Sequence, residues 1–215
     1  MNSTAESVAE ILLKIKAVSL RPNQPFRYSS GILSPVYTDC RLLISNSKER
    51  KKIINLYIKA IKKANKPFDV VAGTSTAGIP HAAWIADALN LPMIYVRGSA
   101  KDHGKGNQIE GSIKKGQTAI IIEDLISTGK SSIETANAIR KAGAKANTVF
   151  SIITYGMKSA EDNFKENKVK LVSLASFEDI VNKASKMKYI KPNDQAAVLD
   201  WAQNPTAWGK KMGFE

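Results

Sequence analysis

Hydrophobic residues along this chain recur either at helical spacing or in short continuous runs. Over 4–18 and 47–65 they return every three or four positions, which predicts two amphipathic helices, the first with Thr4 as its N-cap. The run Ala119, Ile120, Ile121 and Ile122 has no polar alternation, which is typical of a strand covered by helices on both faces. Further strands are predicted over 68–72, 93–96, 146–154 and 169–173. Further helices are predicted over 79–89, 131–142, 159–167, 177–183 and 193–201.

These strands and helices alternate along the chain. Such alternation predicts an α/β fold with a mainly parallel central sheet flanked by helices. Ahead of them, the stretch from Phe26 to Asp39 holds two strand-like runs around the turn residues Ser29, Ser30 and Gly31, which predicts a hairpin. A length of 215 residues suits one domain with a full core and a small appended lobe.

The chain is strongly basic, with a net charge of +13 and a pI near 9.7. Lysines are dense over 48–66 and 183–191, which raises the alternative of a nucleic-acid-binding protein. Over 47–65, however, the apolar residues form one helical face and leave the lysines on the solvated side, without interleaved aromatic residues. We therefore expect no nucleic-acid partner, and we expect the charge to steer polyanionic small substrates.

Cysteine and histidine are scarce. Cys40 is the single cysteine, which excludes an internal disulfide framework and cysteine-based zinc clusters and favours a reducing compartment. Two isolated histidines, His81 and His103, do not make a metal site, and His81 fits a surface or packed residue. No apolar run approaches the roughly 20 residues of a membrane span, and no signal-peptide pattern is present. We expect a cytoplasmic protein without membrane contact.

The stretch 119–131 combines a strand, two acids and a hydroxyl-rich turn. Glu123 and Asp124 come at the carboxyl end of the strand, where open α/β sheets bind ligands, and adjacent carboxylates accept hydrogen bonds from the vicinal hydroxyls of a ribose. The turn Ser127–Ser131 leads into a helix, so its N–H groups and hydroxyls are placed to bind a 5-phosphate. The alternative is an ordinary strand, turn and helix with Ser131 as N-cap. A P-loop is excluded, because Asp124 stands where that motif needs glycine.

Two further polar segments follow predicted strands. Gly73–Gly78 is a turn of small residues before a helix, where backbone N–H groups can approach a diphosphate, although an ordinary turn fits equally well. The segment 97–111 is rich in glycine and has few apolar anchors. Its cations are unusual for a linker, and the alternative is a solvated loop. These cations are Arg97, Lys101, His103 and Lys105.

A family resemblance rests on three of these stretches. The sequence EDLISTGKS, Glu123–Ser131, resembles the signature of the type I phosphoribosyltransferases and is similar to that of the orotate phosphoribosyltransferases. The glycine-rich segment resembles their catalytic lid, with a Lys-x-His-Gly core at 101–104. The predicted hairpin is similar to a stretch of their hood at Phe26, Ser30, Gly31, Ser34, Pro35, Tyr37, Asp39 and Arg41.

The resemblance implies the type I phosphoribosyltransferase fold as one domain over 1–215, with a hood over roughly 1–45 and part of the C-terminus and a core over roughly 46–190. It implies transfer of the 5-phosphoribosyl group from 5-phospho-α-D-ribose 1-diphosphate (PRPP) to orotate, giving orotidine 5′-phosphate and pyrophosphate in UMP biosynthesis. Mg²⁺ would be held mainly by substrate oxygens, without a protein metal site. A homodimer is implied, in which Arg97, Lys101 and His103 act in the neighbouring site.

The resemblance also implies roles for individual residues. Lys101, His103 and Asp124 would be catalytic. Residues binding PRPP would be Arg97, Lys101, His103, Glu123, Asp124, Leu125, Ile126, Ser127, Thr128, Gly129, Lys130 and Ser131. The pyrophosphate loop would comprise Thr74, Ser75, Thr76, Ala77 and Gly78. Orotate would contact Ser127, Phe26 and Tyr37.

The chain departs from the family pattern at several positions. Ser29, Ala77 and Gly98 stand where many relatives carry lysine, and Thr154 and Tyr155 stand where some carry an orotate-contacting arginine. Two alternatives therefore stay open. One is a phosphoribosyltransferase for another base, such as a purine or uracil, and the other is a nucleic-acid-binding regulator on the same fold.

Overall fold

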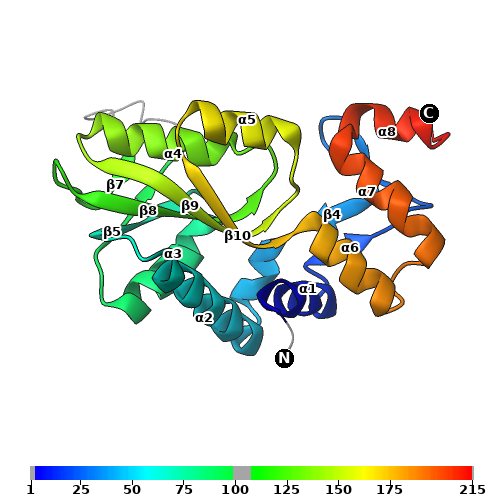
Figure 1. Ribbon diagram of the computed structural model, residues 1–215, viewed down its shortest axis with the longest axis horizontal. Coiled ribbons are helices and arrows are strands. Elements are labelled where there is room, and N and C mark those ends of the chain that lie inside the picture. Colours follow the sequence, from blue (N-terminus) through cyan, green and yellow to red (C-terminus); the bar gives the residue numbers. More distant parts are fainter. Residues whose placement is uncertain (1–2, 99–107, 215) are drawn as a thin grey trace.

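The computed structural model describes residues 3–98 and 108–214 and is built on a six-stranded sheet (Figure 1). The strands lie in the order β10-β9-β8-β5-β6-β7, of which β7 alone runs antiparallel to its neighbour. The predicted α/β class with a mainly parallel sheet is confirmed. The strands span Val70–Thr74 (β5), Met93–Val96 (β6), Ile109–Glu110 (β7), Thr118–Ile126 (β8), Lys145–Thr154 (β9) and Lys170–Ser176 (β10).

Helices cover both faces of the sheet, α2 and α3 on one face and α4 and α5 on the other (Figure 1). Strand β8 shows the physical reason. Ile120 and Ile122 belong to the hydrophobic cluster that contains α2 and α3, whereas Ile121 belongs to the cluster that contains α4 and α5. In the described part of the chain no helix is both long enough and apolar enough to cross a membrane. These helices span Ser47–Ala64 (α2), Gly78–Leu89 (α3), Lys130–Lys141 (α4) and Lys158–Glu166 (α5).

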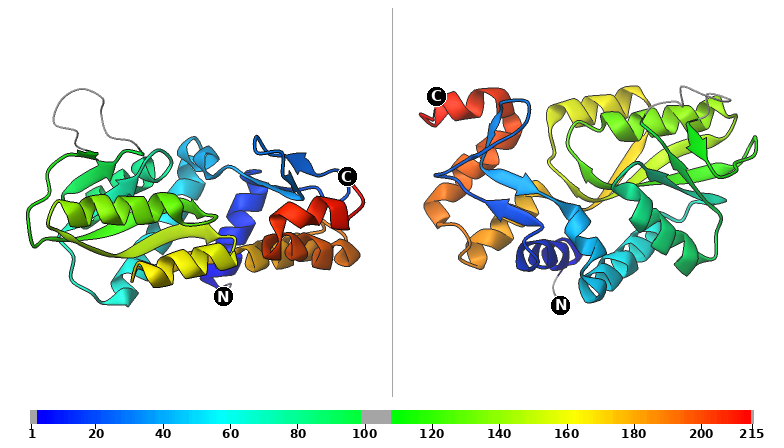
Figure 2. Two further views of the ribbon diagram at one scale, coloured as in Figure 1. Left: turned by 90° about the horizontal axis from the view of Figure 1, so that it is seen from above. Right: turned by 180° about the vertical axis from the view of Figure 1, so that it is seen from behind.

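A hood formed by both ends of the chain lies beside the β10 edge of the sheet (Figure 2). Trp201 is central to its packing: the side chain is buried, its ring lies edge-on to three aromatic rings, and its indole N–H donates to the Leu33 carbonyl at 3.1 Å. Trp208 is also buried. The hood elements are α1 (Thr4–Lys14), β1 (Val18–Leu20), β2 (Phe26–Arg27), β3 (Leu33–Ser34), β4 (Val36–Thr38), η1 (Cys40–Ile44), α6 (Phe177–Lys186), η2 (Pro192–Asp194), α7 (Gln195–Gln203) and α8 (Pro205–Lys211).

Several boundaries differ from the prediction. Helix α1 is capped by Ser3 rather than Thr4, because Ser3 forms a reciprocal capping box, and the helix ends early at Lys14. The turn at 29–31 joins only β2 to β3, while β4 pairs with β1 instead. Helix α8 was not predicted, because its short sequence has too few apolar positions to show a helical period.

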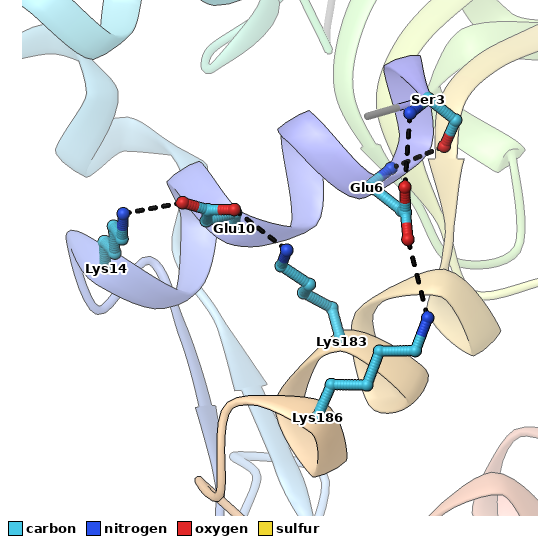
Figure 3. A network of polar contacts seen from close by, with 6 residues as sticks. All are labelled: Ser3, Glu6, Glu10, Lys14, Lys183 and Lys186. Carbon is cyan, nitrogen blue, oxygen red and sulfur yellow. Dashed lines mark hydrogen bonds and ion pairs between the residues drawn. The ribbon is translucent and has the colours of Figure 1, made fainter. Parts of the chain in front are cut away.

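Paired charges join helices α1 and α6 (Figure 3). Glu10 accepts hydrogen bonds from Lys14 Nζ at 2.6 Å and lies 2.8 Å from Lys183 Nζ. Glu6 faces Lys186 at 3.5 Å. The hydrogen bonds from Lys14 and then Lys183 lower the pKa of Glu10 from 4.5 to about 2. Helices α1 and α6 of the hood are thus held together partly by the Glu10 carboxylate, which stays ionised in mild acid.

Replacing Glu10 with glutamine should lower the thermal stability slightly at neutral pH. The folded pKa lies below the unfolded value, so the ion pairs stabilise the fold above pH 4.5 and stop doing so as pH falls towards 2. Because the pairs are near the surface, we expect a Tm difference of about 3 °C or less at pH 7. Thermal melts of wild type and Glu10→Gln from pH 7 to pH 2 should converge. A difference that stayed constant down to pH 2 would show that the charge is not responsible.

Candidate active site

The acid pair lies at the predicted carboxyl end of strand β8, and the strand itself is longer than the predicted run 119–122. Strand β8 continues to Ile126, because Glu123 and Leu125 keep their parallel register with Ser151 and Ile153 of β9. The polar turn therefore begins only at Ser127. This places both carboxylates at the carboxyl end of a central strand, supported by hydrogen-bonded neighbours on either side.

Each acid of the pair has its own partners. The Glu123 carboxylate accepts from Ser132 Oγ at 3.3 Å and from the Asp124 N–H at 3.1 Å. The Asp124 carboxylate accepts from the Leu125 N–H at 2.7 Å. Burial raises the pKa of Glu123 well above its ordinary value, and the charge of Asp124 adds to that effect. Burial also raises the pKa of Asp124, against the opposing effect of the Leu125 N–H. The pair is therefore poised to bind hydroxyl groups and to gain charge when a cation approaches.

Replacing Glu123 with glutamine should stabilise the fold above pH 4.5. Because the folded pKa is raised, the unfolded chain releases its proton first, and the wild type loses stability as pH rises above 4.5. Glu123→Gln lacks this loss, so we expect its stability advantage over the wild type to grow as pH rises from 4 to 8. Urea denaturation at pH 4, 6 and 8 measures the difference. An advantage that did not grow with pH would contradict the buried-carboxylate explanation.

The turn after β8 leaves a helix start uncapped. Gly129 is the N-cap of α4 with a φ of 77°, and no side chain caps the helix, so Ser131 is not the N-cap. A Cβ at position 129 would meet Phe164 Cε2 at 2.7 Å, so both φ and space require glycine. The Asn163 side-chain amide holds the Thr128 carbonyl at 2.9 Å. The first N–H groups of α4 are therefore available to an anion.

The second predicted turn lies directly beside the first. Strand β5 pairs with β8 up to Gly73 and Ile122, and α3 begins at Gly78 without a side-chain cap. A Cβ on Gly78 would collide with the Ile122 carbonyl, so glycine lets this helix start approach β8 closely. The Ser75 N–H donates to the Val96 carbonyl at 3.0 Å, and the Ser75–Thr76 peptide bond is cis. Two uncapped helix starts and an acid pair thus meet at one edge of the sheet.

The remaining predicted contacts are spread over other elements. Arg97 follows β6 and lies 3.6 Å from Glu110, while Lys101 and His103 lie outside the described residues. Phe26 and Tyr37 pack against one another in the hood, with ring centroids 5.6 Å apart, and the described residues show no hydrogen bond or ring contact between them and the turn at Ser127. Among the predicted PRPP-binding residues Glu123–Ser131, the side chains of Glu123 and Ile126 are buried.

Three residues without a predicted role support the acid pair. The Tyr57 hydroxyl, buried on α2, donates to the Glu123 carbonyl at 2.6 Å. Ser132 holds the Glu123 carboxylate. Arg41 is held by two hydrogen bonds to Asp39, at 2.7 and 3.1 Å, and its charge partly opposes the rise that burial causes in the pKa of Asp124. The apolar helical pattern identified Tyr57 only as a core residue, and Arg41 was noticed only as part of the hairpin motif.

His81 is packed in the core rather than exposed. Its side chain is 1% exposed and lies against the rings of Tyr57 and Trp84. Burial, and then the charge of Arg50, lower its pKa to about 4, so it is neutral at pH 7. Across residues 3–98 and 108–214, no three His, Cys, Asp or Glu side chains group closely enough to hold a metal ion.

Comparison with known proteins identifies the family. The family model "Phosphoribosyl transferase domain" matches residues 43–186. An orotate phosphoribosyltransferase of Listeria innocua is 48% identical over 208 residues, which are 97% of this chain and 100% of the relative. This chain belongs to the orotate phosphoribosyltransferase family. Another orotate phosphoribosyltransferase, from Coxiella burnetii, is also 48% identical, over 97% of this chain and 99% of its own.

A solved structure of the orotate phosphoribosyltransferase family shares the fold as well. The crystal structure of orotate phosphoribosyltransferase from Aeropyrum pernix superposes with a TM-score of 0.73 at 30% identity. It covers 85% of this chain and 99% of its own. The predicted family and the type I phosphoribosyltransferase fold are therefore confirmed, whereas the roles of the individual site residues stay predictions.

Proposed function

We propose that this chain transfers the 5-phosphoribosyl group from PRPP to orotate, giving orotidine 5′-phosphate and pyrophosphate in UMP biosynthesis. The observation that carries the proposal is the meeting of the acid pair with two uncapped helix starts, at the ends of β5 and β8. That arrangement matches a substrate with a diol and two phosphate groups. The chain that carries it is 48% identical to orotate phosphoribosyltransferases over nearly its whole length.

In this proposal, catalysis is electrostatic. Departure of pyrophosphate leaves positive charge on the ribose ring, and Asp124 and Glu123 stabilise it while holding the ribose hydroxyls. The N–H groups and hydroxyls of Ser127–Ser131 hold the 5-phosphate, and Ser127 also reaches the pyrimidine. The turn Thr74–Gly78 binds the diphosphate through its backbone, which accounts for Ala77 in place of a lysine. No covalent nucleophile is required, and attack by the base inverts the anomeric carbon.

We infer that Mg²⁺ accompanies PRPP at this site. Carboxylate oxygens are ligands that Mg²⁺ accepts, and Glu123 and Asp124 are the described carboxylates beside the two turns. Glu123 and Asp124 would be its few protein ligands, and substrate oxygens would supply the others. When bound, it supplies neutralisation of the charge on the leaving pyrophosphate.

The lid and the dimer are part of the same proposal. Arg97, Lys101 and His103 of one subunit close over the neighbouring site, exclude water and neutralise the leaving group. Leu42 and Ile44 of η1 are 40% and 37% exposed, and covering these apolar side chains with a second copy of the chain would favour a homodimer. The proposed compartment is the cytoplasm, where the free thiol of Cys40 stays reduced.

A turnover assay tests the function. Orotate, hypoxanthine, adenine and uracil are each offered with PRPP, with and without Mg²⁺, and pyrophosphate release is measured. We expect turnover with orotate that depends on Mg²⁺. Use of a purine or of uracil alone would assign the chain to another base. Absence of turnover together with salt-dependent nucleic-acid binding would favour the regulator.

Lys101→Ala should lower kcat by more than about tenfold, because one cation that neutralises the leaving group in the transition state is worth over about 1.4 kcal/mol. Steady-state kinetics with orotate and PRPP measure it. Lys105→Ala, in the same segment, is the matched control and should change kcat less than about twofold. Equal effects of the two substitutions would remove the assigned role of Lys101.

A further inference from the structure

A half-open cavity of about 430 Å³ lies apart from the acid pair, and neither acid nor any residue of the two turns lines it. It is lined by the C-terminal half of α2, residues of β10 and the start of α1, elements that lie close together in Figure 1. The acid pair is at the carboxyl end of β8, whereas Lys170, which lines the cavity, is the first residue of β10. Ser173 of the pocket pairs with Ser151 of β9, and Ser151 pairs with Glu123, so strand β9 separates the pocket from the acid pair.

Three lysines line this cavity without any acid. Lys59 and Lys63 are four positions apart and so share one face of α2, and Lys170 faces them from β10. No Asp or Glu lines the cavity, and within the described ranges none of the three ammonium groups has an ion pair. By contrast, Lys14 and Lys183 near α1 are each paired with Glu10. Three like charges around one space repel each other, and a polyanion would relieve that repulsion.

The cavity wall between the lysines is apolar. Leu56 and Ala60 project from α2, and Val172 and Leu174 from β10, and all four belong to or pack against the hydrophobic core. The volume falls within the usual range for small-molecule sites, which combine an apolar wall with a few placed polar groups. Thr4, the first residue of α1, also lines the cavity.

We propose that this cavity binds a nucleoside triphosphate, with its phosphates at Lys59, Lys63 and Lys170 and its base against the apolar wall. Three cations offset most of the negative charge of a triphosphate, and the apolar wall distinguishes a nucleotide from inorganic phosphate. This site is separate from the one proposed for phosphoribosyl transfer and does not depend on it.

Lysine footprinting tests the site directly. The protein is acetylated briefly with and without ATP, and modified lysines are quantified by mass spectrometry. We expect ATP to slow acetylation of Lys59, Lys63 and Lys170 by at least about threefold, while Lys51, Lys62 and Lys145, which are exposed elsewhere, change little. Uniform protection of all six lysines, or of none, would overturn the proposal.

Matched triple variants provide the second test. Lys59→Gln, Lys63→Gln and Lys170→Gln together, and Lys51→Gln, Lys62→Gln and Lys145→Gln together, remove the same three charges. ATP binding is measured by calorimetry with PRPP present in excess, so that nucleotide does not enter the catalytic site. We expect the first variant to bind ATP at least about tenfold more weakly, and the second to stay within about twofold of wild type.

Two further measurements distinguish binding at this site from non-specific electrostatic attraction and from binding at the catalytic site. Inorganic tripolyphosphate should bind more weakly than ATP, because it lacks a group for the apolar wall. Tripolyphosphate binding as tight as ATP binding, or equal losses in the two triple variants, would overturn the proposal. Both variants should keep the orotate turnover of the wild type, so a loss of ATP binding is not a loss of folding. A failure of orotate turnover in wild type would leave the ATP measurements interpretable.

Discussion

Asp124→Asn should lower kcat for phosphoribosyl transfer by about 10²–10³, or roughly 3–4 kcal/mol of transition-state stabilisation. Asp124 is at the end of β8 beside both turns, and in the proposed mechanism its charge faces the ribose ring as positive charge develops. Asparagine keeps the size of the side chain and an oxygen that can accept from the Leu125 N–H, which lies 2.7 Å from the carboxylate. The change therefore removes charge with little change in packing.

The measurement is steady-state kinetics with orotate and PRPP, together with a thermal melt. Asp69→Asn is the matched control, because the Asp69 carboxylate accepts from the Thr118 N–H at 2.8 Å, at the opposite end of the same strand. We expect Asp69→Asn to leave kcat within about twofold of wild type. A kcat for Asp124→Asn as high as that of the control would remove Asp124 from the catalytic residues. A large fall in the Tm of Asp124→Asn would show that the loss of activity comes from a loss of folding instead.

Trp201→Ala should lower the free energy of unfolding by about 3–5 kcal/mol. The side chain is 1% exposed and lies edge-on to Tyr28, Tyr155 and Phe177, with centroids 5.2–6.2 Å away. Alanine would leave a large cavity between the hood and the end of β9, and it would leave the Leu33 carbonyl without its indole partner. Chemical denaturation measures the change.

Trp201→Phe separates packing from hydrogen bonding. Phenylalanine keeps most ring contacts and loses the N–H that donates to Leu33, so we expect a loss of only about 1–2 kcal/mol. If Trp201→Ala and Trp201→Phe destabilised equally, the hydrogen bond would dominate rather than the packing. A loss below about 1 kcal/mol for Trp201→Ala would contradict a central role for this residue in the hood.

Much of the fold was readable from local pattern. The run 119–122 predicted a strand buried on both faces, and Ile120, Ile121 and Ile122 do contact different helix layers. At its polar end, however, the strand is longer than this apolar run indicates. The apolar run stops at Ile122, whereas pairing with β9 continues the strand through Glu123 and Asp124 to Ile126. Tertiary hydrogen bonding overrode the polarity that marks a strand end in sequence.

The sequence by itself determined the α/β class, the two turns after β5 and β8, and the family. Each of these depends on a local pattern of residues only a few positions apart. Only the tertiary structure decided what surrounds the acids. Tyr57 reaches the Glu123 carbonyl across 66 positions, and Trp201 reaches Leu33 across 168. It also brought Lys59, Lys63 and Lys170 around one cavity. Contacts at such separation depend on how the layers pack, and no periodicity within a helix or strand records that.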